Sequence, residues 1–276
     1  MGSPLGVWQR AWAKTRWGGW LFELLVFTYK NAASCVFPVS IFLLLAVSKV
    51  TELPIPRYDF LLLGCLAMQA LMLVTRLETF DELKVICVFH VLGLTMELFK
   101  THMGSWTYPE DAFTKLVTVP LYSGFMYASV ASFMCQAWRR FDLKLVRWPV
   151  GYLVVPLGAM IYLNFFTHHY TVDLRWMLIV AVFMFFARTK IKFTTYQRER
   201  SLPLVLAFIL IGLFVWIAEN IATFLGAWIY PNQASGWQIV DASKVTAWGL
   251  LVIVSFLIVA QLKHVKESRE WKGSDQ

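Results

Sequence analysis

Long runs of uncharged, apolar residues are the feature of this sequence that most restricts its fold. The runs occupy roughly residues 32–47, 60–74, 85–99, 117–138, 148–166, 174–186, 202–224 and 245–262. A helix needs roughly 20 apolar residues to cross the hydrocarbon layer of a membrane, and within lipid only a helix satisfies its own backbone amides. The sequence therefore predicts an all-α fold, a polytopic transmembrane helix bundle of about eight spans.

The composition agrees with a chain that is solvated mainly by lipid. Of its 276 residues, 58% are hydrophobic and 15% are charged, and the net charge is +8. The basic residues stand in short clusters between apolar runs and not along one aromatic-rich surface, which disfavours nucleic acid as a partner. Membrane lipids are the predicted partners.

The basic clusters also predict the orientation of the chain. Most of the 25 Lys and Arg residues fall in alternate loops, such as 139–147 and 188–200. By the positive-inside rule these loops face the cytoplasm, which places both termini there in a multi-pass protein of the plasma (inner) membrane. Residues 1–31 carry tryptophans among basic residues and are predicted to form an amphipathic helix in the membrane interface. Residues 263–276 are predicted to be a cytoplasmic tail.

A block of thirteen residues occurs twice in the chain. The pattern E-x6-G-x-W-x-Y-P spans residues 97–109, the first motif, and residues 219–231, the second motif. Identities at fixed spacing indicate an internal repeat, which divides the apolar runs into two sets of four. Because four spans return the chain to its starting side, two parallel four-helix repeats, residues 32–138 and 139–262, are predicted, with both motifs on the outer face.

Each motif begins with a glutamate inside an apolar run. Glu97 and Glu219 precede the motif glycines by seven residues, about 10 Å along a helix. An ionised carboxyl is costly at that depth and is expected to face the bundle interior, a cavity or a partner. A carboxyl that is kept neutral suits a proton donor, so both glutamates are predicted catalytic residues.

The other motif residues admit two interpretations. Glycine permits a tight turn, proline ends a helix, and tryptophan and tyrosine suit a membrane interface, so their role can be purely structural. Alternatively, the aromatic residues line an apolar substrate pocket beside the acids. The residues predicted to bind substrate are Trp106, Tyr108, Trp228, Tyr230, Trp216, Asn220, Tyr127 and Asn164.

Three histidines lie near the glutamates in the predicted bundle. His90 is seven residues before Glu97 on nearly the same helix face, which fits either a buried structural histidine or a proton relay. His168 and His169 follow the fifth run at the height of both glutamates, and all three are candidate catalytic residues. Histidines and carboxylates are also metal ligands, but the spacing carries no metal signature and no metal site is predicted. The cofactor and the oligomeric state are left unknown.

Other sequence features narrow the possible chemistry. The sequence contains no nucleotide-binding glycine loop, no H-E-x-x-H and no G-x-S-x-G, which disfavours nucleotide-driven pumping and the familiar proteolytic mechanisms. Cys35, Cys65, Cys87 and Cys135 stand singly within apolar runs, so they are predicted to be reduced thiols in the core.

With the paired motifs in view, the chain resembles a bacterial family of integral membrane proteins of unknown function, typified by YoaT. The likeness rests chiefly on residues 97–109 and 226–231 and implies a membrane location without a reaction. A more distant resemblance is to the carotenoid hydratase and small-subunit lycopene cyclase families, in which acidic residues protonate a polyene. Glu97 and Glu219 would match those acids, although the families' glycine and phenylalanine spacing is not reproduced here.

Three functions fit these observations. The first is an intramembrane acid/base enzyme that acts on an isoprenoid, a carotenoid or a lipid through the paired glutamates. The second is a secondary transporter in which the same carboxylates bind a proton or cation. The third is a non-catalytic membrane scaffold whose repeat serves folding alone.

Overall fold

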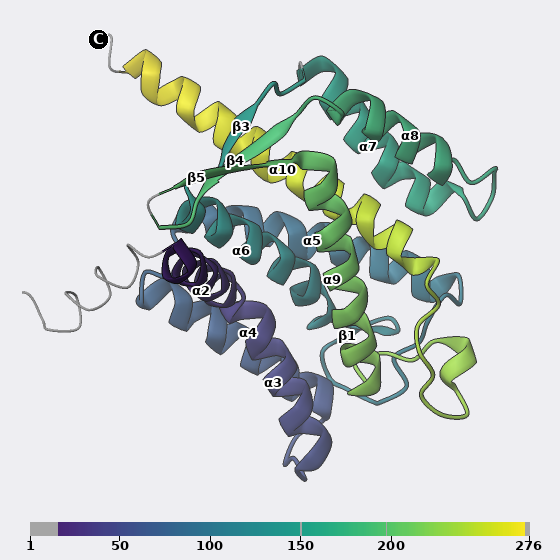
Figure 1. The fold of residues 1–276 in the computed structure, drawn as a ribbon. Coiled ribbons are helices and arrows are strands. Elements are labelled where there is room, and N and C mark those ends of the chain that lie inside the picture. The colour runs from purple at the N-terminus through teal and green to yellow at the C-terminus, as the bar shows by residue number, and fades with distance from the viewer. Residues whose placement is uncertain (1–15, 150, 197, 274–276) are drawn as a thin grey trace, which may run out of the picture.

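The chain is predominantly helical (Figure 1). The computed structural model describes residues 16–149, 151–196 and 198–273, with side chains between Gly19 and Ala260. The helices are α2 (Arg16–Ser34), α3 (Val36–Val50), α4 (Arg57–Val74), α5 (Phe80–His102), α6 (Ser123–Phe141), α7 (Gly151–Thr167), α8 (Arg175–Phe186), α9 (Leu204–Phe224) and α10 (Lys244–Gly273), with a 3-10 turn η1 (Pro231–Gln233). The first half of the predicted interfacial segment, residues 1–15, lies outside the described residues.

Each predicted apolar run overlaps one helix, from α3 to α10 in order. In the part of the chain that the structure describes, only α4 and α9 are long and apolar enough on their own to cross a membrane, and α2 with α3, bent by 62°, would make a third span. The helices α7 and α8 are short, α5 carries charged residues, and α6 is rich in small and polar ones. A mostly helical fold is therefore confirmed, with two or three candidate spans by length and composition where the sequence predicted about eight.

Two small antiparallel sheets were not predicted. The strands β1 (Lys115–Leu116) and β2 (Val119–Pro120) form a hairpin before α6, and β3 (Lys144–Val146), β4 (Lys190–Thr194) and β5 (Glu199–Pro203) form a sheet in the order β3-β4-β5. The basic loops read from sequence as topology markers supply this second sheet. In β4 an exposed Lys190 precedes a buried Ile191, the alternation of a strand with one face covered.

The helix α6 is central and packs against α2, α3, α5 and α10 (Figure 1). Its small side chains allow close approach, since Gly124 meets His90 of α5 and Tyr127 lies against Gly93. In the second half, Gly212 of α9 lies against Gly249 of α10. Glycines at helix contacts let backbones approach in a lipid-solvated bundle, where close packing replaces the hydrophobic effect.

No disulfide joins the four cysteines. Cys65 and Cys135 are buried as predicted, but Cys87 is exposed on the surface of α5, so its assignment to the core was wrong. The apolar run predicts burial for the whole helix, whereas α5 packs on one side only.

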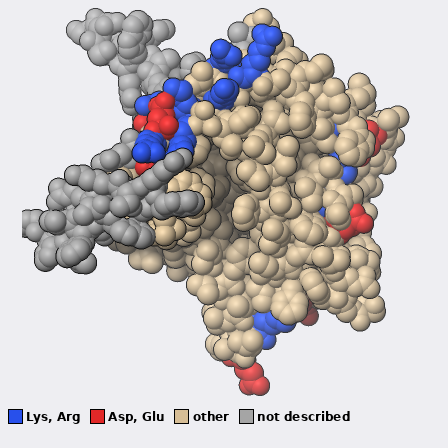
Figure 2. Space-filling model, viewed as in Figure 1, with Lys and Arg blue, Asp and Glu red and all other residues tan. Residues whose placement is uncertain are grey.

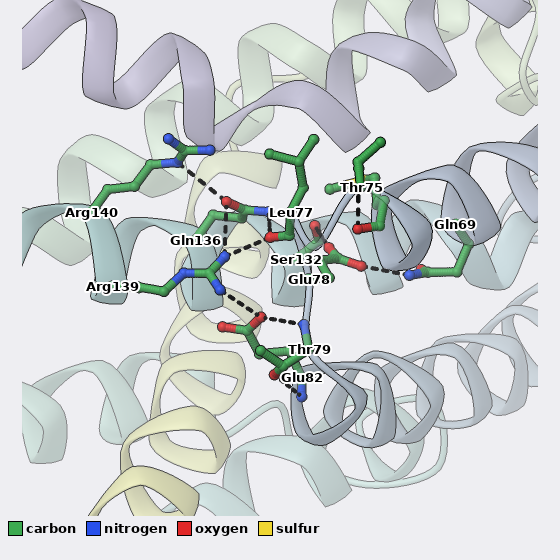
Figure 3. A network of polar contacts seen from close by, with 11 residues as sticks. Gln69, Thr75, Leu77, Glu78, Thr79, Glu82, Ser132, Gln136, Arg139 and Arg140 are labelled. Atoms are coloured by element: carbon green, nitrogen blue, oxygen red, sulfur yellow. Dashed lines mark hydrogen bonds and ion pairs between the residues drawn. The ribbon is translucent and has the colours of Figure 1, made fainter.

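A buried polar network joins the α4–α5 turn to α6 (Figure 3). Glu78 is 2% exposed and accepts hydrogen bonds from the Gln69 amide and the Ser132 hydroxyl. Gln136 donates to the Leu77 carbonyl at 2.6 Å. Burial raises the pKa of the Glu78 carboxyl, so this turn favours a neutral group.

The next helix begins at the same place. Thr79 and Glu82 form a reciprocal capping box at the start of α5, with the Thr79 amide donating to Glu82 at 2.9 Å. Arg139 of α6 pairs with Glu82 at 3.5 Å. Together these contacts fix the register of α5, and hence of Glu97, against α6.

We expect Glu78→Gln to keep the network and Glu78→Ala to break it. A glutamine still accepts from Ser132, and its amide can donate to the Gln69 carbonyl oxygen, which has no partner in the native network. Alanine leaves buried polar groups unpaired, at a cost of about 1–3 kcal/mol. Thermal unfolding in mild detergent measures the difference.

The pH dependence of unfolding supplies the control. Burial raises the pKa of Glu78 in the folded protein. Its contribution to the free energy of unfolding is therefore complete at acid pH and is lost as the pH rises through the folded pKa. Glu78→Gln should flatten this slope, and equal losses of stability in both variants would contradict the assignment.

Candidate functional site

The two motif glycines end their helices in the same way. Gly104 and Gly226 have φ angles of +70° and +77°, a region that other residues rarely adopt. The amide after each glycine donates to a carbonyl in the last turn of the helix, which is a Schellman cap. The structural role predicted for these glycines is confirmed, and both turns send the chain back toward the helix that it has just left.

The two motifs then pair with each other. Thr107 and Ile229 occupy equivalent positions and exchange both backbone hydrogen bonds, at 2.9 and 3.0 Å. Beside them the rings of Trp106 and Tyr230 meet edge to face, with centroids 5.9 Å apart. The ends of α5 and α9 therefore converge.

Glu97 is buried at this junction, with 3% of its surface exposed. Its carboxyl accepts from the Trp106 indole at 2.6 Å, the Tyr108 hydroxyl at 2.8 Å and the Tyr127 hydroxyl at 2.7 Å. Two of these donors belong to the first motif, and the third comes from α6. Three donors compensate the loss of hydration that burial imposes on the carboxyl group.

Glu219 has the same burial and a similar set of donors. It is 3% exposed and accepts hydrogen bonds from Tyr230 of its own motif and from Trp248 of α10. Trp228 does not donate to it, and Trp248 takes the corresponding role. Each glutamate is thus held by the motif tyrosine, one tryptophan and a helix that follows the motif.

The motif tyrosines lie outside the helices and remain protonated. Burial, together with the adjacent glutamate, raises the pKa of Tyr108 and of Tyr230 well above the ordinary value. Their hydroxyl groups are therefore available at neutral pH to donate to the carboxyls or to pass on a proton.

Both glutamates line one large cavity of about 1100 Å³. Trp106, Tyr127 and Tyr230 face it at the motif end. Apolar side chains from α2, α3, α6, α9 and α10 form most of the wall, and the cavity reaches the sheet at Ile191 and Leu202. This volume is at the upper end of the range for ligand-binding sites in proteins.

The sheet end of the cavity is formed by three aromatic rings. Phe27, Phe141 and Phe193 contact one another, with centroids 5.5, 6.0 and 6.1 Å apart. On the face seen in Figure 2, a hollow surrounded by uncharged side chains lies between α2 and α9, two of the helices that line the cavity.

A cluster of basic side chains stands at the motif end of the cavity. Lys100 is 7% exposed, and its ammonium group lies 2.8 Å from His169 Nε2 and 3.3 Å from His168 Nε2. Burial and nearby Lys100 lower the pKa of both imidazoles, that of His169 to about 4, so both are neutral acceptors at pH 7. The described residues contain no group of three or more His, Cys, Asp or Glu placed to hold a metal ion.

Five candidates from the sequence do not reach the cavity. Asn164 bonds Asp173 and the Leu174 amide to close the α7–α8 turn, at 3.1 Å each. Asn220 and Trp216 hold the loop before α10 through Val240, at 2.9 and 3.2 Å.

His90 is the fourth predicted site residue that does not reach the cavity. Its ring packs against Phe125 with centroids 4.6 Å apart, and its buried Nδ1 has no hydrogen-bond partner. It lies between α5 and α6, away from both glutamates, so the structural interpretation of this histidine is the one that the packing favours. Tyr108 likewise lies behind the cavity wall, although it bonds Glu97.

Two contributors were missed in the sequence. Trp248 follows Glu219 by 29 residues, whereas Tyr127 follows Glu97 by 30, so the offset between the motifs places Tyr127 opposite Gly249, one residue after Trp248. Lys100 stands one helical turn after Glu97 and was counted only as a charge in an outer loop. Its position on the glutamate's face of the helix was the available signal.

These features define a class of helical protein in which two duplicated, buried carboxyls open onto one apolar cavity. Residues 23–256 match the family described as "Protein of unknown function (DUF817)", and the chain belongs to this family. It is 56% identical over 252 residues to the "Uncharacterized protein YoaT" of Bacillus subtilis (strain 168), covering 91% of this chain and 96% of that protein. No solved structure matches.

The resemblance to the YoaT family is thereby confirmed. The likeness to carotenoid hydratases and lycopene cyclases stays a prediction, because neither the family model nor the relative carries a reaction in its description.

We expect cysteines at the paired motif positions to form a disulfide. Residues that exchange both ladder hydrogen bonds have Cα atoms about 5.5 Å apart, within the range of disulfides. Thr107→Cys with Ile229→Cys, in a chain whose four native cysteines are replaced by alanine, should cross-link under mild oxidation. A protease cut between the motifs and a non-reducing gel would reveal the bridge.

The matched control moves one partner out of register. Thr107→Cys with Ala227→Cys should cross-link far more slowly, because Ala227 lies two residues away from Ile229, the residue that pairs with Thr107. Equal rates for the two pairs would contradict the pairing of the motifs.

Proposed function

We propose that this protein is a multi-pass membrane enzyme that performs acid/base chemistry on a long apolar substrate, such as an isoprenoid, a carotenoid or another lipid. The observation that carries the proposal is the shared cavity, because a large apolar space with two buried carboxyls on its wall fits proton transfer to an apolar molecule. Glu97 and Glu219 are its catalytic residues.

A membrane location is supported by the surface as well as by helix length. Large apolar side chains are exposed along α4, α8 and α9, among them Leu63, Met184 and Phe214. On the face in Figure 2 the charged residues gather mainly near the sheet and at the edges, and the broad area between is uncharged. Such a surface is costly in water and suits lipid contact. The proposal retains the eight helices α3 to α10 as the membrane domain, with both termini in the cytoplasm.

The chemistry follows from the placement of the two carboxyls. One glutamate, protonated, gives its proton to a carbon of a double bond, and positive charge develops on the neighbouring carbon. The second, ionised glutamate removes a proton from the next carbon, so that the double bond shifts and no oxidant is needed. The rings of Trp106, Tyr230 and Tyr127 stand beside the acids, where their faces can stabilise the developing cation.

The hydrogen bonds suit this exchange of roles. Each carboxyl contacts a tyrosine hydroxyl that lines the cavity, Tyr127 for Glu97 and Tyr230 for Glu219. A hydroxyl both donates and accepts, so it can stabilise either form of the acid or relay the proton. No Lys or Arg among the described residues forms an ion pair with either glutamate, and none fixes it permanently in the charged state.

The test is proton exchange into apolar lipids. Purified protein is incubated in deuterated water with a lipid extract of its host, and deuterium in the apolar fraction is measured by mass spectrometry. The wild-type protein should label one class of lipid, and Glu97→Gln and Glu219→Gln should each lower the rate about 10²- to 10⁴-fold, the usual share of a general acid or base.

Asp111→Asn is the matched control, since Asp111 is an exposed acid just after the first motif. Its labelling rate should equal that of the wild type. Proton-coupled uptake into proteoliposomes without labelling would favour the transporter instead. Neither labelling nor uptake by the wild-type protein would favour the scaffold, and labelling that is unchanged in both variants would contradict the catalytic role of the glutamates.

A further inference from the structure

Lys100 is a buried cation that forms no ion pair within 4 Å among the described residues. Its side chain lines the cavity, and its two nitrogen partners are the neutral rings of His168 and His169. An ammonium group has three N–H donors, so one remains for a group inside the cavity. None of the ion pairs among the described residues includes Lys100. A buried charge that is left unpaired is strongly destabilising, so an anion at this position would relieve a cost built into the fold.

Two more cations line the same end of the cavity. Lys244, at the start of α10, lies over the Tyr230 ring at 4.9 Å and has no ion pair in the described part of the chain. Arg175 pairs with Asp173 at 3.3 Å, and its other terminal nitrogen is 3.4 Å from the Thr246 hydroxyl.

Asp173 pairs with Arg175, and the other nearby acids have partners outside the basic cluster. Asp241 accepts from the Ser243 amide at 2.8 Å, and Glu219 is held by Tyr230 and Trp248. Ser105 and Ser243 also line the cavity, and each carries a side-chain hydroxyl. The motif end thus presents an excess of positive charge with hydrogen-bond donors to the cavity, while the rest of the wall is mostly apolar.

The shape of the cavity completes the picture. From the basic end it passes the two glutamates and continues between α6 and α9 to the phenylalanines at the sheet. A molecule that fills it therefore needs a charged head and a long apolar tail, with the first atoms of the tail lying beside Glu97 and Glu219.

We infer that the substrate is an anionic amphiphile whose phosphate group binds to Lys100, Lys244 and Arg175, and whose apolar tail occupies the cavity. Phosphate is favoured over a single carboxylate because three cations surround one site, and lysine and arginine both bind phosphate oxygens. The inference deepens the proposed function and rests on it only in calling the bound molecule a substrate. The binding itself does not depend on the reaction.

The experiment measures binding of matched probes to protein that has been stripped of lipid by detergent exchange. The probes are hexadecyl phosphate, hexadecanol and inorganic phosphate, and titration calorimetry or native mass spectrometry gives each Kd. Hexadecyl phosphate should bind at least about tenfold more tightly than either of the others, because it alone satisfies both ends of the cavity.

Variants locate the phosphate. Lys100→Met should weaken the binding of hexadecyl phosphate at least about tenfold and leave the binding of hexadecanol unchanged. Lys244→Met should do the same, which keeps the test decisive if one variant fails to fold. The control is Lys84→Met on the same helix, because Lys84 is 77% exposed and far from the cavity.

Each outcome decides between the head-group inference and the proposed reaction. Equal affinity for hexadecyl phosphate and hexadecanol, or unchanged affinity in both lysine variants, overturns the inference. The proposed acid/base reaction would then still be tested by deuterium exchange. Inorganic phosphate that binds as tightly as the amphiphile overturns the role of the tail. Tight, lysine-dependent binding without deuterium exchange would support the inference and reject the acid/base enzyme.

Discussion

The hydrogen bonds from aromatic side chains to two buried carboxyls are the interaction on which this structure depends. A carboxyl group removed from water needs donors of its own, and tyrosine and tryptophan supply them while remaining compatible with an apolar interior. Glu97 receives three such bonds and Glu219 two. Without them the ends of α5 and α9 would carry an uncompensated cost at the point where the two halves of the chain meet.

The spacing of the motif follows from this requirement. Seven residues after the glutamate the glycine ends the helix in a left-handed turn, which directs the chain back along its own side. In the extended segment that follows, alternate residues share a face, so the tryptophan and tyrosine of W-x-Y lie on the same side. The residue between them, Thr107 or Ile229, leaves its backbone free to pair with the other motif. One short pattern therefore buries an acid, supplies part of its donors and joins two distant segments.

The features that could be predicted are those that repeat along the chain. Apolar runs located the helices, and the duplicated glutamates located the junction, because both signals depend on local composition and spacing. Tyr127 was predicted only as a residue of the substrate pocket and Trp248 not at all, because both come from helices outside the motif and only packing brings them to the acids. Lys100 was overlooked because a basic residue near a helix end is usually a topology marker. The basic loops that pair into a sheet were missed for the same reason, since charge masked a period of two in β4.

The predicted number of spans was less reliable for a related reason. A hydropathy run does not give the length of the helix that forms from it: α7 has 17 residues and α8 has 12, fewer than the roughly 20 that a span needs. Asn164, Asn220 and Trp216 were assigned to substrate because they are polar or aromatic near the acids. Their hydrogen bonds instead close the turns that position α8 and α10.

The three phenylalanines at the sheet have a consequence for selectivity by size. Phe27, Phe141 and Phe193 belong to α2, α6 and β4, so the end of the cavity is built from segments that are far apart in the chain and fixed by one another. Packed aromatic rings resist displacement, because an added methylene in a filled interior has no free volume to enter. These three rings would limit the length of the tail: molecules up to a certain number of carbons fit with their reactive portion beside the carboxyls, and longer ones do not.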